Sequence, residues 1–438
     1  MHKEDRAIQN SNDSVSSAAF MHRNFRLFWV GQFVSLVGTQ MQAVTINWHV
    51  YLLTKSAFAL GLVGLARFIP LVLCSLIGGA VADAYDRRRT MLVAQTVMMA
   101  VAAFLAIESS LNLKSALPIY ILTAISSAAS AFDTPARQSL VPALVPTAQL
   151  SSAVSFVSVA FQSATIAGPL LAGLLLASHG PALIYILNAL SFLAVITSLM
   201  AINVNRGHRS GSTHKPSFGS IAEGLKFVRR TPVIVQTMMI DFVATVTASV
   251  TGLLPIFAVE VLRVGPRGLG TLAAAPAAGA IVSGLVIAKY GFGRRPGVMM
   301  LSAVAIYGLA TLAFGISRAF FISLMLLAIM GATDIISTVI RQTTRQLMTP
   351  DRLRGRMTSI NMIFFNGGPR LGELQAGFVA AVLGAPLAVM LGGVTCVSAV
   401  IMIAFRARNL LALPALSDRS LQKLGTIVGG QDAGLGSN

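Results

Sequence analysis

The sequence predicts an all-α membrane protein with twelve transmembrane helices in two six-helix bundles that are related by a parallel repeat. Three observations support this prediction: an apolar composition, a succession of apolar stretches long enough to cross a bilayer, and an internal repeat. Of the 438 residues, 55% are hydrophobic and 11% are charged. Soluble domains carry about 25% charged residues, so the composition indicates an integral membrane protein.

Composition and motifs argue against several other classes of protein. The net charge of +18 suggests nucleic-acid binding, but no Asp, Glu, Lys or Arg occurs from Gln138 to Asn205, and the basic residues gather in short tracts between apolar runs. Cys74 and Cys396 lie inside apolar runs, so they predict neither a disulfide framework nor a metal site. The sequence contains no Walker phosphate loop, HExxH or GxSxG motif. We therefore expect no enzyme activity, no catalytic residues, no cofactor, no metal and no nucleic-acid partner.

The expected elements follow from apolar stretches of about 20 residues, the length that spans a bilayer as a helix. Glycine and proline occur inside several of them, and membrane helices tolerate these residues. In chain order, the twelve expected helices cover residues 26–53, 58–82, 90–110, 115–142, 150–178, 181–202, 232–262, 267–290, 297–316, 319–347, 357–383 and 386–405.

The distribution of basic residues predicts the orientation in the membrane. With both termini in the cytoplasm, most of the 33 Lys and Arg residues fall in cytoplasmic segments. The expected outer loops then hold Lys55, Lys114, Arg263, Arg267 and Arg318. Because Lys and Arg are enriched on the cytoplasmic side, we expect a multi-pass protein of the cell (inner) membrane with both termini cytoplasmic.

An internal repeat relates the two halves of the chain. When the chain is shifted by 204 residues, Arg137-Gln138 falls on Arg341-Gln342 and Gly168 falls on Gly372. Further pairs at the same offset are Pro146 and Pro350, Ser155 and Ser359, Phe161 and Phe365, Ala172 and Ala376, Gly173 and Gly377, and Gly180 and Gly384. Six expected helices separate the copies, so the halves have parallel topology, as in transporters whose substrate path lies between two repeats.

The repeat and the polar segments define the expected domains. They are an N-terminal bundle at 1–205, a cytoplasmic linker at 206–231, a C-terminal bundle at 232–410 and a mobile cytoplasmic tail at 411–438. Within the linker, apolar residues recur at helical spacing, which predicts a helix on the membrane surface. These residues are Phe218, Ile221, Leu225 and Val228.

Ionisable side chains inside membrane spans are costly and are candidates for function. We expect a proton-coupling group among Asp241, Asp133 and Glu373. Asp241 fits best, because its own expected helix carries no cation near it, whereas Asp133 and Glu373 have Arg137 and Arg370 one turn away. The alternative is that each charged group only holds the bundle together through ion pairs.

The expected substrate cavity contains polar and basic groups from several spans. Arg67 has no obvious partner in the sequence, and Asn47 and Trp48 can contact a ligand. The adjacent His49 fits a packing role equally well. The full set of cavity candidates is Arg67, Asn47, Trp48, Arg137 and Arg341.

The stretch from Gly79 to Arg89 resembles the signature loop between the second and third spans of the major facilitator superfamily. Matching residues are Gly79, Ala82, Asp83, Arg87 and Arg88, whereas Ala84 and Asp86 replace a family Arg and Gly. The resemblance implies a gating loop of Gly79, Asp83, Asp86, Arg87 and Arg88, in which Asp83 latches the two halves near Arg354 and Arg356. A plain cytoplasmic basic loop is the alternative, although it does not explain the position of Asp83.

Two further resemblances concern helix packing and substrate class. Gly168-Pro169 and Gly173 resemble the antiporter motif of the superfamily, and ordinary packing of small residues is the alternative. Across nearly the whole chain, six short stretches resemble the enterobactin-exporter-like branch. They are Arg23 to Trp29, Ala59 to Val63, Ala136 to Pro142, Glu223 to Arg230, Arg354 to Arg356 and Leu371 to Gly377.

The branch resemblance implies a secondary transporter that exports a siderophore or related amphipathic metabolite by proton-coupled alternating access. A broad-specificity multidrug exporter is the alternative, and a non-transporting receptor or scaffold is disfavoured by the charges within spans. The expected partners are a small-molecule substrate, protons and the lipid bilayer, and we expect a monomer.

Overall fold

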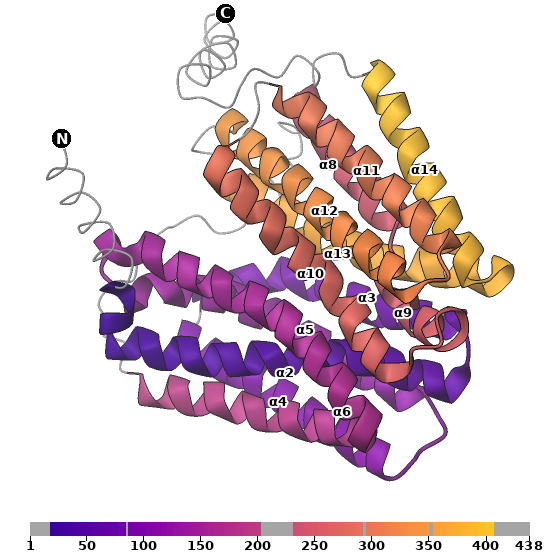
Figure 1. Cartoon of the computed structure of the whole chain (residues 1–438). Coiled ribbons are helices and arrows are strands. Elements are labelled where there is room, and N and C mark those ends of the chain that lie inside the picture. Colours follow the sequence, from indigo (N-terminus) through magenta and orange to yellow (C-terminus); the bar gives the residue numbers. More distant parts are fainter. Residues whose placement is uncertain (1–17, 85, 203–230, 292–294, 350–353, 407–438) are drawn as a thin grey trace, which may run out of the picture. The chain divides into compact units, whose positions relative to one another are not determined.

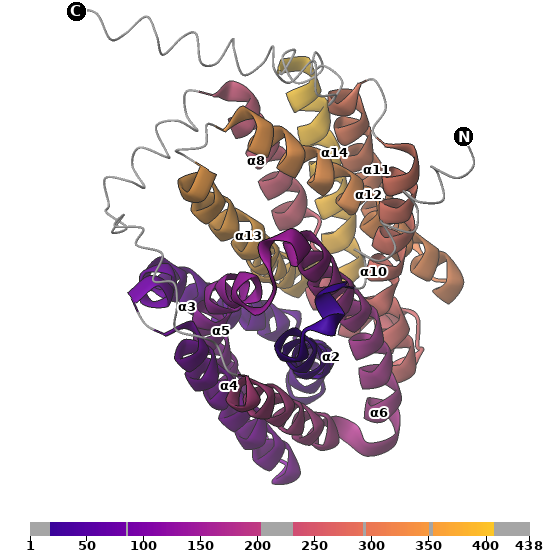
Figure 2. The same cartoon turned by 90° about the vertical axis from the view of Figure 1, so that its left-hand side faces the viewer.

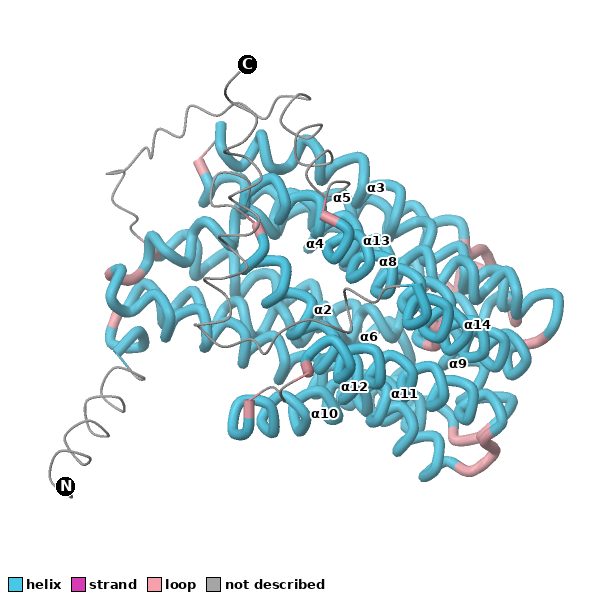
Figure 3. Tube along the Cα trace, turned by 90° about the horizontal axis from the view of Figure 1, so that it is seen from above, coloured by secondary structure: helices cyan, strands magenta, loops and turns pink. Residues whose placement is uncertain are grey.

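The structure, a computed structural model, describes residues 18–84, 86–202, 231–291, 295–349 and 354–406 (Figure 1). These residues form helices joined by turns and short loops and include no strand, as Figure 3 shows. The predicted all-α fold class is therefore confirmed. The linker and tail predictions lie outside the described residues.

The first half of the chain forms five long helical elements. They are α2 (Arg23–Thr54), α3 (Ala57–Ala84), α4 (Arg87–Ser110), α5 (Leu117–Leu144) and α6 (Leu150–Ala201), with short 3-10 turns η1 (Ala18–Met21) and η2 (Thr147–Gln149). Inside α6, Gly180 has φ 72° and ψ −171°, a backbone conformation that glycine adopts without a steric penalty. The element therefore consists of two helices that meet at Gly180.

The second half begins with a broken helix. The chain passes through α8 (Pro232–Thr247), the 3-10 turn η3 (Thr251–Leu253), α9 (Leu254–Ile256) and the π-helical η4 (Phe257–Val261). It continues through α10 (Gly265–Tyr290), α11 (Pro296–Ile316), α12 (Phe320–Met348), α13 (Arg354–Leu383) and α14 (Ala385–Arg406). Gly384, with φ 83°, separates α13 from α14 at the position that the 204-residue repeat pairs with Gly180.

The predicted spans coincide with helices, but not as twelve separate elements. Residues 150–178 and 181–202 lie in one continuous element, and 232–262 is divided after Thr247. Among the described residues, eight helices are long and apolar enough to cross a membrane. Apolar length thus predicts where the chain is helical better than where one helix ends and another begins.

The chain divides into two compact units. Unit 1 comprises Met1–Lys55, Ala66–Lys215 and Val264–Ala274. Unit 2 comprises Ser56–Leu65, Pro216–Arg263 and Ala275–Asn438. The first turns of α3 therefore belong to unit 2, and the first turns of α10 belong to unit 1.

In unit 1, α2 packs along α6, and α4 packs against both α5 and α6 (Figure 2). Buried apolar side chains that include Phe25, Phe28 and Leu199 form a core between them. Small residues set the spacing of α2 and α6, since a side chain at Gly38 would collide with Asn188 and Ser191. Close helix approach through small residues is typical of membrane proteins.

In unit 2, α11 packs against α12 and α14, and α8 packs against α13 and α14. Ile240, Met300 and Ile340 are among the buried residues of the core between these helices. Glycines again allow close contact: a side chain at Gly331 of α12 would overlap the backbone of Pro276 in α10, and one at Gly372 of α13 would overlap α8.

Candidate functional site

A buried ion pair in unit 2 joins α8 to α12. Arg341 Nη2 lies 2.7 Å from Asp241 Oδ1, and the two side chains are 3% and 8% exposed. The guanidinium also donates to Ser337 Oγ at 2.7 Å and to Thr338 Oγ1 at 2.8 Å, both on its own helix. These two hydroxyls fix the direction of the arginine, so that it is aimed at the carboxylate of α8.

Further charged groups surround this pair. Asp334, two turns before Arg341 on α12, is exposed and lies within electrostatic range of both Asp241 and Arg341. Arg345, one turn after Arg341, is buried and also interacts electrostatically with Asp241. The four groups together contribute two positive and two negative formal charges. Balanced charge makes the burial of Asp241, Arg341 and Arg345 tolerable, because each ion has a counter-ion nearby.

The expectation that Asp241 lacks a cation needs correction. It holds along α8, but Arg341 reaches Asp241 from α12, a helix that lies far along the chain. Helical periodicity reports neighbours on one helix only, and the contact depends on how α8 and α12 pack. Asp241 remains a predicted proton-coupling residue, with an arginine as its partner.

In unit 1, the carboxylate of Asp133 on α5 is buried between two partners. Gln95 on α4 donates from Nε2 to Asp133 Oδ1 at 2.8 Å, and Arg137 Nε lies 3.7 Å from Oδ2. The predicted one-turn pairing with Arg137 is therefore present. The contact with Gln95 was not predicted, because the two residues are 38 positions apart and on different helices.

Glu373 also has the expected neighbour on its own helix. Arg370 donates from Nη1 to Glu373 Oε1 at 2.7 Å, and the glutamate side chain is 4% exposed, against 37% for the arginine. In unit 2, Gly64 of α3 and Gly252 of η3 lie against the side chain of Glu373. The absence of side chains at these glycines leaves room for the carboxylate at a crowded helix contact.

The predicted cavity residues of unit 1 occupy two kinds of position. Arg67 donates from Nη2 to the carbonyl of Ala43 on α2 at 3.3 Å, and its own carbonyl accepts from Ser127 on α5 at 2.6 Å. Asn47 and Trp48 are buried on α2, and Oδ1 of Asn47 has no hydrogen-bond partner among the described residues. Arg67 thus links three helices, whereas Asn47 retains an unused acceptor.

Sequence reasoning missed one buried acidic residue, Glu108 on α4. Its side chain is 4% exposed, and neither carboxylate oxygen accepts a hydrogen bond from any described residue. His49 Nδ1 of α2 lies 3.9 Å from Glu108 Oε2 and 3.3 Å from the hydroxyl of Tyr185 on α6. Glu108 is the one charged residue of the predicted span 90–110, and that signal could have identified it.

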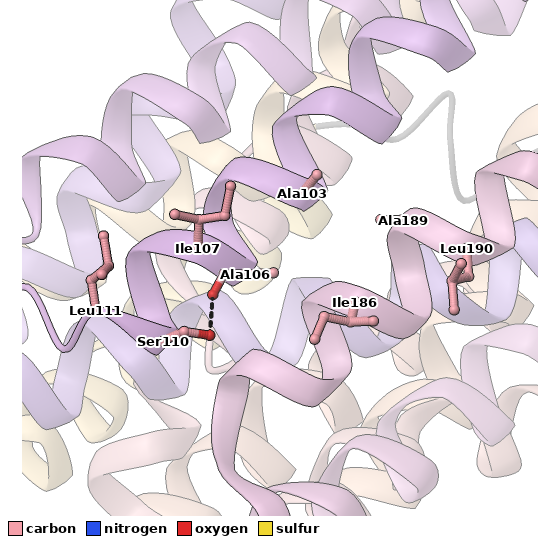
Figure 4. A pocket seen from close by; sticks show the side chains of 8 residues that line it. All are labelled: Ala103, Ala106, Ile107, Ser110, Leu111, Ile186, Ala189 and Leu190. Carbon is pink, nitrogen blue, oxygen red and sulfur yellow. Dashed lines mark hydrogen bonds between the residues drawn. The ribbon is translucent and has the colours of Figure 1, made fainter.

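An apolar groove lies on the other side of α4. It has a volume of about 390 Å³ and is lined by Ile107 and Leu111 of α4 and by Ile186 and Leu190 of α6, among others (Figure 4). Ile107 is 54% exposed although it is adjacent to the buried Glu108. The groove therefore presents hydrocarbon, whereas the buried polar residues Gln95 and Glu108 lie on the side of α4 that faces the interior of unit 1.

Three residues of the predicted gating loop, Asp86, Arg87 and Arg88, lie at the start of α4. Asp86 caps this helix by accepting a hydrogen bond from the backbone of Arg89 at 3.0 Å, a favourable arrangement at a helix N-terminus. Arg87 donates to the carbonyl of Ser139 at 3.0 Å, and Arg88 donates to that of Met200 at 3.0 Å. Gly79 and Asp83 lie in α3, and their side chains are outside the described set.

The small residues of α6 contact two different helices of unit 1. Gly168 faces α2, where an added side chain would meet Gln40 and the carbonyl of Val37. A Cβ at Gly173 would lie 2.8 Å from the carbonyl of Pro266 and 2.9 Å from Cα of Gly270, at the start of α10. The packing interpretation of this motif therefore agrees with the contacts.

Comparisons with known proteins agree with this architecture. The family model described as "Transmembrane secretion effector" matches residues 14–423. Enterobactin exporter EntS of Salmonella choleraesuis is 26% identical over 366 residues, which cover 83% of this chain and 87% of that protein. Enterobactin exporter EntS of Escherichia coli is 25% identical over 366 residues, covering 83% and 86%.

Solved transporter structures share the fold at low sequence identity. A POT family transporter has a TM-score of 0.71 and 11% identity, covering 89% of this chain and 96% of its own. A bacterial homologue of the lysosomal transporter Spinster has a TM-score of 0.68 and 15% identity, covering 94% and 98%. The family match and the enterobactin exporters that resemble this chain indicate a membrane transporter rather than an enzyme. The chain belongs to the transmembrane secretion effector family of the major facilitator superfamily.

Proposed function

We propose that this protein exports a siderophore or a related amphipathic metabolite from the cytoplasm in exchange for protons. Twelve membrane-spanning helices in two bundles would alternate between inward and outward access, with both termini cytoplasmic and the chain acting as a monomer. The substrate class is suggested by the relatives that are named enterobactin exporters and match along 83% of this chain.

The observation that carries proton coupling is the buried pair of Asp241 and Arg341. Breaking a buried ion pair by neutralising one partner costs about 3–5 kcal/mol, because the other charge remains without compensation. A proton that binds Asp241 would therefore weaken the contact between α8 and α12 and favour a different packing. Substrate binding and proton binding can then be coupled through one equilibrium.

Enterobactin is the first compound to test. Cells that produce both the compound and this protein should release more enterobactin into the medium than matched cells that lack the protein. The inactive control is a variant in which Arg341 is replaced by Gln, because that substitution removes the guanidinium that is paired with Asp241. Equal release from both strains would contradict export of this siderophore.

A panel of unrelated lipophilic compounds tests the alternative. If the protein expels many of them with similar efficiency, a broad multidrug exporter replaces the siderophore exporter. If it binds enterobactin in purified form but moves no compound across a membrane, a receptor function replaces transport. Intracellular accumulation of enterobactin on expression would reverse the proposed direction.

A further inference from the structure

A second titratable cluster lies in unit 1 and is independent of the Asp241–Arg341 pair. Three helices contribute one group each: His49 from α2, Glu108 from α4 and Tyr185 from α6. All three side chains are buried, with residue exposures of 8%, 4% and 0%. Their rings and carboxylate are in contact range, because the His49 and Tyr185 ring centroids are 6.0 Å apart and Nδ1 of the histidine lies 3.9 Å from the carboxylate.

The surroundings limit the charge states that this cluster can adopt. An ionised carboxylate that is buried without a hydrogen-bond donor is strongly disfavoured, and both oxygens of Glu108 lack such a donor among the described residues. Binding of one proton removes this unfavourable state of the buried carboxylate in either of two ways. The proton forms an O–H bond on Glu108, or it forms an N–H bond on His49, which then becomes the counter-ion of the glutamate.

Titratable and charged groups on the packed helices also face the cluster. Tyr185 faces His49 from α6, and Arg67 of α3 lies within electrostatic range of Tyr185. From α5, which packs against α4, the first turns contribute the half-buried Tyr120. The Tyr185 hydroxyl orients the imidazole, since it contacts the same nitrogen that faces the carboxylate. Tyr185 is therefore a positioning residue for the imidazole.

We propose that Glu108 and His49 together bind one exchangeable proton and form a second proton-coupling site, located in unit 1. The proton would come from water on one side of the membrane and return to water on the other, with no other bond made or broken. This inference rests on the proposed proton-coupled export for its role in transport, but the binding of the proton can be tested without any substrate.

The direct test uses infrared difference spectroscopy on the purified full-length protein in lipid nanodiscs. Between acidic and alkaline buffer, the wild type should lose a protonated-carboxyl C=O absorption that Glu108→Gln lacks and that Asp241→Asn and Glu373→Gln retain. Proton release on the same pH jump should fall by one proton per chain in Glu108→Gln. An unchanged carboxyl absorption and proton count in Glu108→Gln would overturn the site.

Two further variants separate proton binding from a packing role. His49→Gln keeps the carboxyl but removes the imidazole, so the pH midpoint of the Glu108 absorption should shift, and an unchanged midpoint would remove His49 from the site. Tyr185→Phe should retain the absorption with an altered band position. Because both variants keep a side chain of similar size, they also provide a result if Glu108→Gln fails to fold.

Transport assays in proteoliposomes decide the role in coupling. With enterobactin as the probe, Glu108→Gln should lose uptake driven by a proton gradient and keep downhill exchange, whereas the exposed Glu260→Gln should keep both. Gradient-driven transport by Glu108→Gln at the wild-type rate would contradict the coupling role. If the wild type moves no enterobactin, the proposed function fails, and the infrared result still decides whether the site binds a proton.

Discussion

Arg341 and Asp241 form a 2.7 Å ion pair across α8 and α12, and two hydroxyls of α12 hold the arginine in place. The pair explains why an acidic residue is tolerated on α8, whose own sequence offers it no cation. It also places a protonatable group at a helix contact, where a change of charge alters packing directly. Three of the five predictions below depend on contacts between helices that the structure shows.

Asp241→Asn should abolish transport driven by a proton gradient while permitting downhill exchange. The amide cannot take up the proton, and it removes the carboxylate that lies 2.7 Å from Arg341, a loss that costs about 3–5 kcal/mol for a buried ion pair. Inside-out vesicles loaded with an acidic lumen provide the assay. The double variant Asp241→Asn/Arg341→Gln removes both charges. It should be more stable than Asp241→Asn, but it should still show no transport driven by the proton gradient. Full gradient-driven transport by the single variant would assign coupling to another group.

The orientation prediction can be tested by cysteine labelling. Asn112 lies in the exposed turn between α4 and α5, and Arg87 lies at the opposite end of α4. A membrane-impermeant thiol reagent added to intact cells should modify Asn112→Cys and leave Arg87→Cys unmodified. Cys74 and Cys396 are replaced beforehand to remove the background. Modification of both positions from outside would refute the topology.

Asp83→Asn should cripple transport while leaving expression and substrate binding largely intact. The family resemblance assigns Asp83 a latching role against the start of α13, a helix N-terminus that carries about half a positive charge. Arg354 and Arg356 add further positive charge there. Transport rates and binding affinities are measured on the same preparation. A normal transport rate would show that no such latch is needed.

Gln95→Leu should destabilise unit 1 by about 1–3 kcal/mol, because it removes a hydrogen bond from the buried carboxylate of Asp133. The midpoint of thermal unfolding in detergent should fall accordingly. Thr96→Val is the matched control, since Thr96 is exposed and its hydroxyl donates to the carbonyl of Leu92 on its own helix. Equal midpoints for the two variants would show that Gln95 contributes nothing to Asp133.

Gly173→Ala should reduce both stability and transport, because the added methyl group would lie 2.8 Å from the carbonyl of Pro266. Overpacking of this kind costs about 1–3 kcal/mol. Gly284→Ala is the control, since a Cβ there meets no atom within 4 Å and alanine favours a helix by up to about 1 kcal/mol. The unfolding midpoint should fall for the first variant and stay level or rise for the second.

The sequence predicts the helices well because a bilayer requires long apolar runs, and it predicts partners only when they share a helix. The pairs Asp133–Arg137 and Arg370–Glu373 follow from one-turn spacing and are present. By contrast, Asp241 with Arg341 and Gln95 with Asp133 depend on the register between packed helices. No periodicity within a single helix specifies that register.

The exchange of helix ends between the two units has a consequence for biogenesis. Unit 1 includes Val264–Ala274, so its last part leaves the ribosome only after more than half of the 438 residues have been made. Ser56–Leu65 are synthesised early but pack in unit 2, where Gly61 and Gly64 lie against α13. Many multidomain chains complete an N-terminal domain first during synthesis. Here each unit includes residues from both halves of the chain. A translation product that ends halfway should therefore leave both units incomplete in the membrane and be degraded.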